Sequence, residues 1–315
     1  MNAGSRVLVA SMLRAVLPMV AMAALMGAIF WQQPRAMSYF GVNLLLNLAI
    51  PVMLATMAQM VVMTIGDLDL SIGAFVSLVA CIVARLMPET PLLATGALLA
   101  CIAGYVAVGA LIQLRKLPAI VVTLGLSFVW AGLAVLLLPT PGGKAPAWLI
   151  AAMQFKPPLA PLPVWMAIAV GLAAHFMLVT SAWGTVMRGA GGNPRSVERA
   201  GWSLLHTRMS LYGLAAIFGI LAGFALVGLT TSGDANIASR YTLVSIAGVI
   251  LGGGEFTGGR ISPVGAVIGA MTLTLATSFL TFMRISPDWQ IGAQGIILIL
   301  VLAVRVAIDR LGRRA

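Results

Sequence analysis

Long apolar stretches fill this chain, and single charged residues separate them. Seven stretches without Asp, Glu, Lys or Arg hold at least 20 residues each, the length at which an α-helix crosses roughly 30 Å of hydrocarbon. They are 15–34, 36–66, 90–114, 117–143, 157–187, 209–233 and 261–283. Three shorter stretches, 70–84, 241–254 and 289–304, either span fully or belong to broken or re-entrant segments. The pattern predicts an all-α polytopic membrane protein with about ten transmembrane helices, in one domain over residues 1–315.

Composition supports this interpretation. Hydrophobic residues make up 61% of the chain and charged residues 9%, with a mean hydropathy of +1.05. A soluble domain has about a quarter of its residues charged, so a water-soluble enzyme, a disordered chain and a secreted disulfide scaffold are excluded. Cys81 and Cys101 both lie inside apolar stretches, which predicts neither disulfides nor a metal site.

The net charge of +11 comes from 19 basic and 8 acidic residues. The basic residues stand singly between apolar runs, so nucleic acid is not an expected partner. With ten crossings and an inside N-terminus, 13 basic residues fall inside and 6 outside, which predicts two cytoplasmic termini. The six placed outside are Arg35, Arg85, Lys144, Lys156, Arg240 and Arg284.

Two loops are long enough to form structure of their own. The outer one, about 139–163, is rich in proline, whereas the inner one, about 184–210, is polar. In the inner loop Asn193 is a favoured N-cap, Pro194 suits the first helical position and Gly201 suits the stop. These signals predict a helix of about two turns. It either docks into a cytoplasmic partner or is a connector on the membrane surface.

Acidic residues next to apolar segments form a second candidate functional site. Asp67 and Asp69 lie in the sequence GDLDLSIG, residues 66–73, and intramembrane acids often mark a substrate or ion path. A simpler interpretation, favoured for Asp69, is that Asp69 or Ser71 caps a helix beginning near Ile72. Further polar residues either line a path or, as favoured for most of them, form interhelical hydrogen bonds; they are Asn43, Asn47, Thr56, Gln59 and Thr64.

No catalytic constellation accompanies these residues. The phosphate-loop pattern is absent, and neither His175 nor His206 has a carboxylate or cysteine at ligand spacing. We therefore expect no catalytic residue, no cofactor and no nucleotide hydrolysis by this chain.

Four motifs in succession resemble a known family. They are GDLDLSIG, then PAIVVTLG at 118–125, GGNPRSVERAG at 191–201, and a glycine run at 252–259 followed by PVGAVIGA. In order and spacing they resemble the ribose/xylose/arabinose-type permease subunit of bacterial ABC importers, over about residues 43–305.

The resemblance implies a type II importer architecture in the bacterial inner membrane. Two ABC ATPase subunits would bind inside, a periplasmic substrate-binding protein outside, and a second permease copy or paralogue alongside, with a small sugar or polyol as substrate. It implies two sets of functional residues. Coupling to the ATPase falls to Gly191, Asn193, Pro194, Arg195, Glu198 and Gly201, and the translocation path to Asp67, Asp69, Ser71, Thr123 and Gly125.

Three departures from the family pattern bear on specificity. Asp67 replaces a usual glycine, Ala131 stands where an arginine is usual, and Glu255-Phe256 replaces a small hydroxyl residue and a leucine. The alternatives are a branched-chain amino-acid-type ABC permease, an ion-coupled secondary carrier that would use Asp67, and a membrane assembly factor without transport.

Overall fold

The computed structural model describes residues 3–286 and, beyond them, Trp289, Gly292, Gly295, Ile296, Ile299 and Ala303. Most of the predicted stretch 289–304 lies outside the described residues. The long helices are α1 (Ala3–Gln32), α5 (Pro91–Arg115), α6 (Ala119–Leu137), α11 (Leu204–Thr230) and α13 (Pro263–Phe282). The shorter ones are α2 (Tyr39–Leu46), α3 (Ala49–Met63), α4 (Ile72–Arg85), α7 (Ala147–Gln154), α8 (Leu162–His175), α9 (Ala182–Gly192), α10 (Pro194–Arg199) and α12 (Tyr241–Leu251), with a 3₁₀ turn at Pro34–Met37 and a π-helical turn at Phe176–Thr180.

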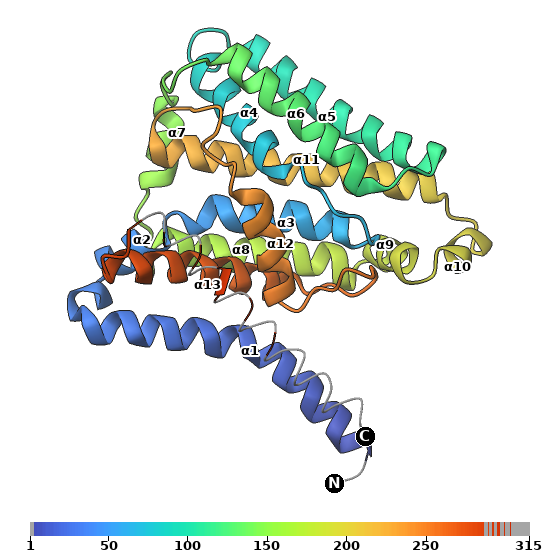
Figure 1. Ribbon diagram of the computed structural model, residues 1–315, viewed down its shortest axis with the longest axis horizontal. Helices are drawn as coiled ribbons and strands as arrows, with labels where there is room; N and C mark the ends of the chain where they lie inside the picture. Colours follow the sequence, from blue (N-terminus) through green and yellow to red (C-terminus); the bar gives the residue numbers. More distant parts are fainter. Residues whose placement is uncertain are drawn as a thin grey trace.

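The helices form one bundle with α3 at its centre. All of Ala49–Met63 is buried, as expected for a helix that is apolar all round. Helix α11 packs on α3, α4 and α5, whereas α13 packs on α3, α8 and α12. Of the other long helices, α6 packs on α4, and α1 packs on α13 and extends away from the bundle (Figure 1). The bundle has two ends, which we call the α10 end, formed by α9 and α10, and the α7 end, formed by α7 and the proline-rich loop.

Helix lengths agree with a polytopic membrane protein but leave the count of ten unconfirmed. Within the described residues, five helical segments are long and apolar enough to cross a membrane, or six if α2 and α3, bent by 41°, form one span. Ten spans therefore stays a prediction, and α4 and α12 are too short to cross as helices alone.

Both short helices follow an irregular segment that enters the bundle. We call residues 64–71, between α3 and α4, the first linker, and residues 231–240, between α11 and α12, the second linker. Both α4 and α12 begin near the middle of the molecule (Figure 1). The ring of Phe75 lies against Gly219, near the middle of α11. The predicted short stretches 70–84 and 241–254 are thus parts of broken segments.

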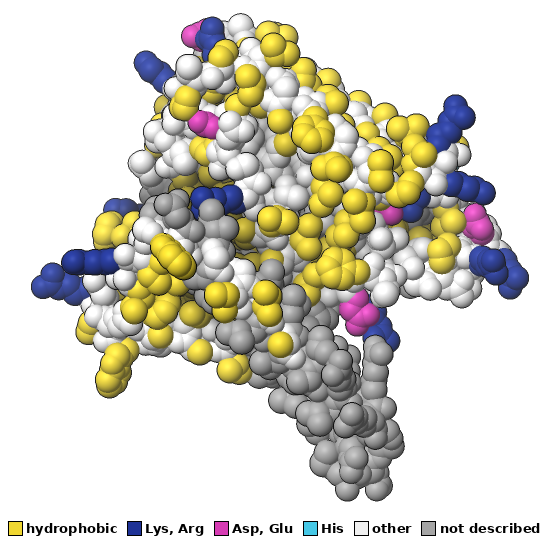
Figure 2. Space-filling view, in the orientation of Figure 1, with side chains coloured by type: hydrophobic (Ala, Val, Ile, Leu, Met, Phe, Trp, Pro, Cys, Tyr) yellow, Lys and Arg dark blue, Asp and Glu magenta, His cyan; other side chains and the backbone are white. Residues whose placement is uncertain are grey.

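Charged side chains lie mainly at the two ends of the bundle, with apolar side chains between them (Figure 2). Lys116 and Arg208 lie together where α5 and α11 approach α10. At the α7 end, the backbone of Lys144 bonds to that of Ala84 beside Arg85. The residues named here that were predicted inside lie at the α10 end and those predicted outside lie at the α7 end; which end faces the cytoplasm stays a prediction.

Candidate functional site

The backbone of the first linker is satisfied by side chains from three helices. The Gln59 amide of α3, oriented so that both of its groups are paired, donates to the Asp69 carbonyl (2.9 Å) and accepts from the Asp69 N–H (3.2 Å). Thr123 of α6 accepts from the Leu70 N–H at 3.1 Å. Thr242 of α12 donates to the Leu70 carbonyl at 3.4 Å and accepts from the N–H of Gly73, in the first turn of α4, at 2.9 Å. Irregular backbone at membrane depth requires such partners because lipid supplies none.

Asp69 organises the start of α4. Its carboxylate accepts from the Ser71 N–H at 2.7 Å and the Ser71 hydroxyl at 2.6 Å. The Tyr105 hydroxyl of α5 donates to the other carboxylate oxygen at 2.9 Å, and all three residues are fully buried. Helix α4 begins at Ile72 as predicted. The N-cap residue is Ser71, but no side chain caps the helix. Asp69 binds the N–H of Ser71 itself, two residues on, so it closes a turn before α4 and the capping interpretation is wrong.

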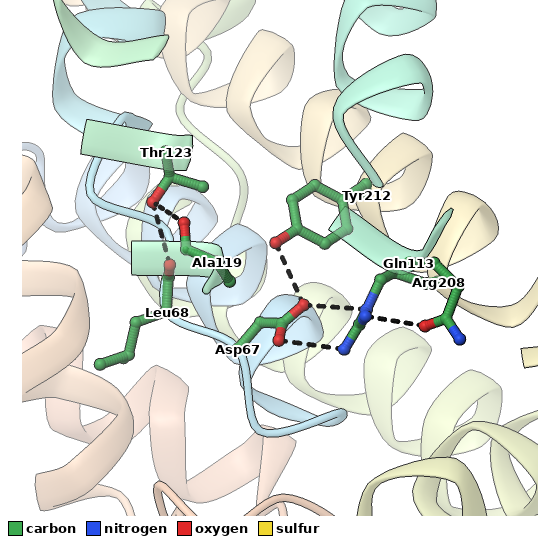
Figure 3. A network of polar contacts seen from close by, with 7 residues as sticks. All are labelled: Asp67, Leu68, Gln113, Ala119, Thr123, Arg208 and Tyr212. Carbon is green, nitrogen blue, oxygen red and sulfur yellow. Dashed lines mark hydrogen bonds and ion pairs between the residues drawn. The ribbon is translucent and has the colours of Figure 1, made fainter. Parts of the chain in front are cut away.

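Asp67 forms an ion pair with α11 (Figure 3). Its two carboxylate oxygens lie 3.1 Å from Arg208 Nε and 3.2 Å from Arg208 Nη2, and the Tyr212 hydroxyl donates to it at 3.2 Å. Arg208 also donates to the Gln113 amide oxygen of α5 at 2.7 Å. The acid that replaces the usual glycine is thus balanced by a specific arginine.

Thr123 and Gly125, both predicted near the path, lie on different faces of α6. Thr123 is fully buried, and its hydroxyl lies 2.9 Å from the Ala119 carbonyl oxygen and 3.1 Å from that of Leu68 (Figure 3). Gly125 is exposed, with open space where a side chain would be. The geometry gives Thr123 a bracing contact with the first linker and leaves Gly125 facing outward.

The other polar residues of the second apolar stretch are mostly internal. Thr56 and Thr64 donate to carbonyls of their own helix, at Val52 and Met60. Both are fully buried, as is Gln59. Interhelical hydrogen bonds were the favoured interpretation; it is wrong for Thr56 and Thr64, which bond within α3. Only Gln59 reaches another segment, at Asp69.

The predicted cytoplasmic helix is present as α10. Asn193 accepts from the Ser196 N–H at 3.2 Å, Pro194 is the first helical residue, and Gly201 has a φ of +85°. Val197 is buried against α9, beside Gly189. Arg195 and Glu198 are exposed. One apolar side chain thus holds α10 on the bundle while its charged side chains face outward.

Helix α9 meets two other segments through glycines. A side chain on Gly191 would overlap the Thr64 carbonyl oxygen and come within 2.6 Å of the Gly259 nitrogen. The Gly259 N–H donates to that same Thr64 carbonyl at 2.8 Å. A side chain on Gly258 would lie 2.8 Å from the Gly66 nitrogen. We call this meeting of α9, the first linker and the loop before α13 the glycine junction.

The other residues that differ from the family pattern, Glu255, Phe256 and Ala131, lie at more exposed positions. Glu255 pairs with Arg260 at 3.3 Å, and Phe256 is half exposed beside it. Ala131 is partly buried on α6; nothing in the structure explains its replacement of an arginine. Sequence reasoning missed Tyr105, Gln113, Arg208 and Tyr212, because their partners lie far away along the chain.

Comparison with known proteins gives a consistent result. Residues 41–302 match the family model described as "Branched-chain amino acid transport system / permease component". No solved structure matches.

Curated relatives cover most of the chain. It is 27% identical to the ribose import permease protein RbsC of Escherichia coli K12, over 85% of this chain and 87% of the relative. The identity is 25% to the fructose import permease protein FrcC of Rhizobium meliloti (92% and 82%) and 28% to the autoinducer 2 import system permease protein LsrC of Yersinia pseudotuberculosis (94% and 86%). The chain therefore belongs to the branched-chain amino acid transport system/permease component family, within which these relatives are sugar-type ABC permeases.

Proposed function

We propose that this chain is the membrane-spanning permease subunit of an ATP-driven importer, and that it translocates a small neutral sugar or polyol. The match over residues 41–302 carries the proposal, together with relatives named as ribose and fructose import permeases. The name of the family also suggests branched-chain amino acids, but the relatives with near-complete coverage are sugar-type permeases.

In the proposed assembly two ABC ATPase subunits bind at the α10 end, on the cytoplasmic side of the inner membrane, where both termini lie. A periplasmic binding protein docks at the α7 end, and a second permease copy or paralogue completes the path. The exposed Arg195 and Glu198 of α10 suit contact with an ATPase subunit. Two grooves lie beside α10 and could receive side chains of such a subunit. One is lined by Trp183, Trp202 and His206, and the other by Gln113 and Pro194.

The glycine junction connects α10 mechanically to the membrane helices, so that a displacement of α10 can reach them. Val197 fixes α10 to α9, and α9 touches Thr64 and Gly259 through bare backbone. These two contacts lead directly into α3 and the first linker on one side, and into the segment between α12 and α13 on the other. Displacement of α10 by ATP binding would therefore shift both broken segments together.

This connection is tested by two neighbouring glycines. Gly191→Ala would place a methyl group on the Thr64 carbonyl, whereas Gly192→Ala adds one into open space. In proteoliposomes holding the whole complex, we expect Gly191→Ala to lower sugar uptake per ATP hydrolysed at least tenfold, and Gly192→Ala to keep the wild-type ratio. Equal ratios in both variants would refute the connection.

The driving force distinguishes this function from an ion-coupled carrier. Such a carrier needs an acid that can take up a proton or a cation, and Asp67 is instead held by Arg208. We expect uptake to require ATP and the binding protein, and Glu198→Arg to abolish co-purification of the ATPase. Uptake that persists without ATPase subunits under an ion gradient would overturn the proposal.

A further inference from the structure

Polar side chains of the second linker lie on the surface of the protein. Asn236, Ser239 and Arg240 are all exposed, directly before α12. The linker is held by local backbone bonds, such as Ile237 N–H to the Asp234 carbonyl, and by Ala238 N–H bonding to the Ser77 hydroxyl of α4 at 3.0 Å. The backbone of the second linker is thus bonded to the protein interior, while these three side chains lie on the surface, where they can contact a ligand.

The depth of these residues follows from their contacts along α4. Gly233 packs on Ala80 and Ala84 near the α7 end, whereas the carbonyls of Ala238 and Ser239 pack on Gly73. Gly73 and Ala84 are eleven residues apart, about 16 Å of helix. Helix α12 then crosses the bundle, and its Gly248 packs on Thr56 in the middle of α3 (Figure 1). The linker therefore turns about halfway through a hydrocarbon core of roughly 30 Å.

A second measure gives the same depth. Phe75, two residues beyond Gly73, lies against Gly219. Gly219 is 15 residues from the start of α11 and 11 from its end. Arg240 was expected in an outer loop, whereas these contacts put it about halfway between the two ends of the bundle.

Nothing among the described residues neutralises Arg240. The ion pairs there involve Arg85, Arg208 and Arg260, and the Asp234 carboxylate accepts from the Asn236 N–H instead. Around α12 the surface is apolar, with Leu243 73% exposed. On the face where α12 lies in front, most Lys and Arg side chains are at the ends (Figures 1 and 2).

An unpaired arginine facing lipid at this depth is costly, and such residues normally face a water-filled cavity. We propose that Arg240 lines the translocation path at mid-depth and selects neutral ligands with adjacent hydroxyl groups. The guanidinium presents a planar fork of N–H donors that fits two neighbouring hydroxyl oxygens. Ser239 and Asn236 add acceptors for the hydroxyl protons. A fixed positive charge there also opposes the passage of cations. The inference rests on the proposed function and deepens it.

The first test needs no substrate. Cys81 and Cys101, both buried, are replaced by alanine, and Ser239→Cys or Arg240→Cys is introduced into the full complex in proteoliposomes. The matched control is Ala103→Cys, an exposed α5 position beside Gly104, whose neighbour Trp130 packs on Phe75 at the same depth. A charged, membrane-impermeant thiol reagent should label positions 239 and 240 at least tenfold faster than position 103. Labelling as slow as at position 103 overturns the inference, and a disulfide between two permeases without labelling would identify a dry contact between copies instead.

The second test uses ribose and fructose as transport probes with the complete importer. Arg240→Leu should lower uptake about tenfold or more, the loss expected for hydrogen bonds from a charged group, and Arg240→Lys should lose less. Arg35→Leu, an exposed arginine at the α7 end, should stay within twofold. Co-purification of the ATPase subunits verifies that each variant assembles.

The outcomes separate the two proposals. If the wild type carries neither sugar, nor any other neutral sugar or polyol, the proposed function fails, and the labelling test still decides whether Arg240 faces water. If the wild type carries a sugar and Arg240→Leu carries it equally well, this inference alone fails. Uptake of an anionic sugar acid in preference to the neutral sugar would contradict the assigned ligand chemistry.

Discussion

The two linkers have the same layout and opposite surroundings. Each carries Gly-Asp at its third and fourth positions, Gly66-Asp67 and Gly233-Asp234. Each enters the bundle from one end, and each leads into a short helix. They meet where Gly73 touches Ala238 and Thr242. Gln59, Thr123 and Thr242 satisfy backbone groups of the first linker and its junction with α4. The second linker bonds mainly to itself and exposes Arg240.

This difference separates support from contact with the ligand. A polar segment whose groups are all paired inside the protein has none left for a substrate, and breaking it is costly. A segment with exposed polar groups at the same depth can still form hydrogen bonds with a substrate. We infer that the first linker fixes the position of α4, while the second linker meets the substrate. The following substitutions test this contrast.

Asp69→Ala should have the largest effect on stability. It leaves the Ser71 N–H and one of two hydroxyls without a buried acceptor, because the Ser71 and Tyr105 hydroxyls, 3.0 Å apart, can still bond to each other. The expected cost is about 4 kcal/mol. The matched change Asp234→Ala removes one acceptor, that of the Asn236 N–H, in a partly exposed turn, and should cost less than about 1 kcal/mol. Thermal unfolding of the purified permease in detergent measures both. Equal losses would show that the two linkers do not differ in support.

Asp67→Gly restores the residue usual in the family and should destabilise this protein. Arg208, whose side chain is 21% exposed, would keep its charge without the carboxylate, at a cost of about 2 kcal/mol after discounting for partial exposure. Arg208→Met in the same chain should recover most of the loss. A double variant no more stable than Asp67→Gly would mean that the pair is not coupled.

These residues also show where inference from sequence stops. Asn193, Pro194 and Gly201 predicted α10 correctly because capping depends on neighbours in the chain. The pairing of Asp67 with Arg208 joins residues 141 positions apart, which no local pattern contains. The position that we propose for Arg240 differs from the outer loop predicted by the charge pattern, for a physical reason. Dividing the chain at its charges assumes that charged residues lie outside the membrane, and a broken helix allows one at mid-depth.

Gly73→Ala should disturb the second linker more than the first. The new methyl group would lie 2.6 Å from the Ala238 carbonyl oxygen and 3.0 Å from that of Ser239, so that linker must move outward, at a cost of about 1–3 kcal/mol. We expect changed labelling of Ser239→Cys in this background. Gly125→Ala, which meets open space, is the control and should leave the labelling rate as it is. A rate unchanged by Gly73→Ala would mean that the linkers do not constrain each other.

Thr242→Val should have the smallest effect on stability. It measures how much α12 contributes to holding the start of α4. Valine keeps the shape of threonine but leaves the Gly73 N–H without the acceptor that it now has at 2.9 Å, which costs about 1–2 kcal/mol. Thr274→Val on α13 is the control, because Thr274 donates to the Ala270 carbonyl of its own helix. Removing this donor should change the free energy of unfolding little. Thermal unfolding should therefore separate the two variants by a few degrees, with Thr242→Val lower. If the two coincide, α4 does not depend on α12 for its first turn, and the broken segments are independent units that merely lie side by side.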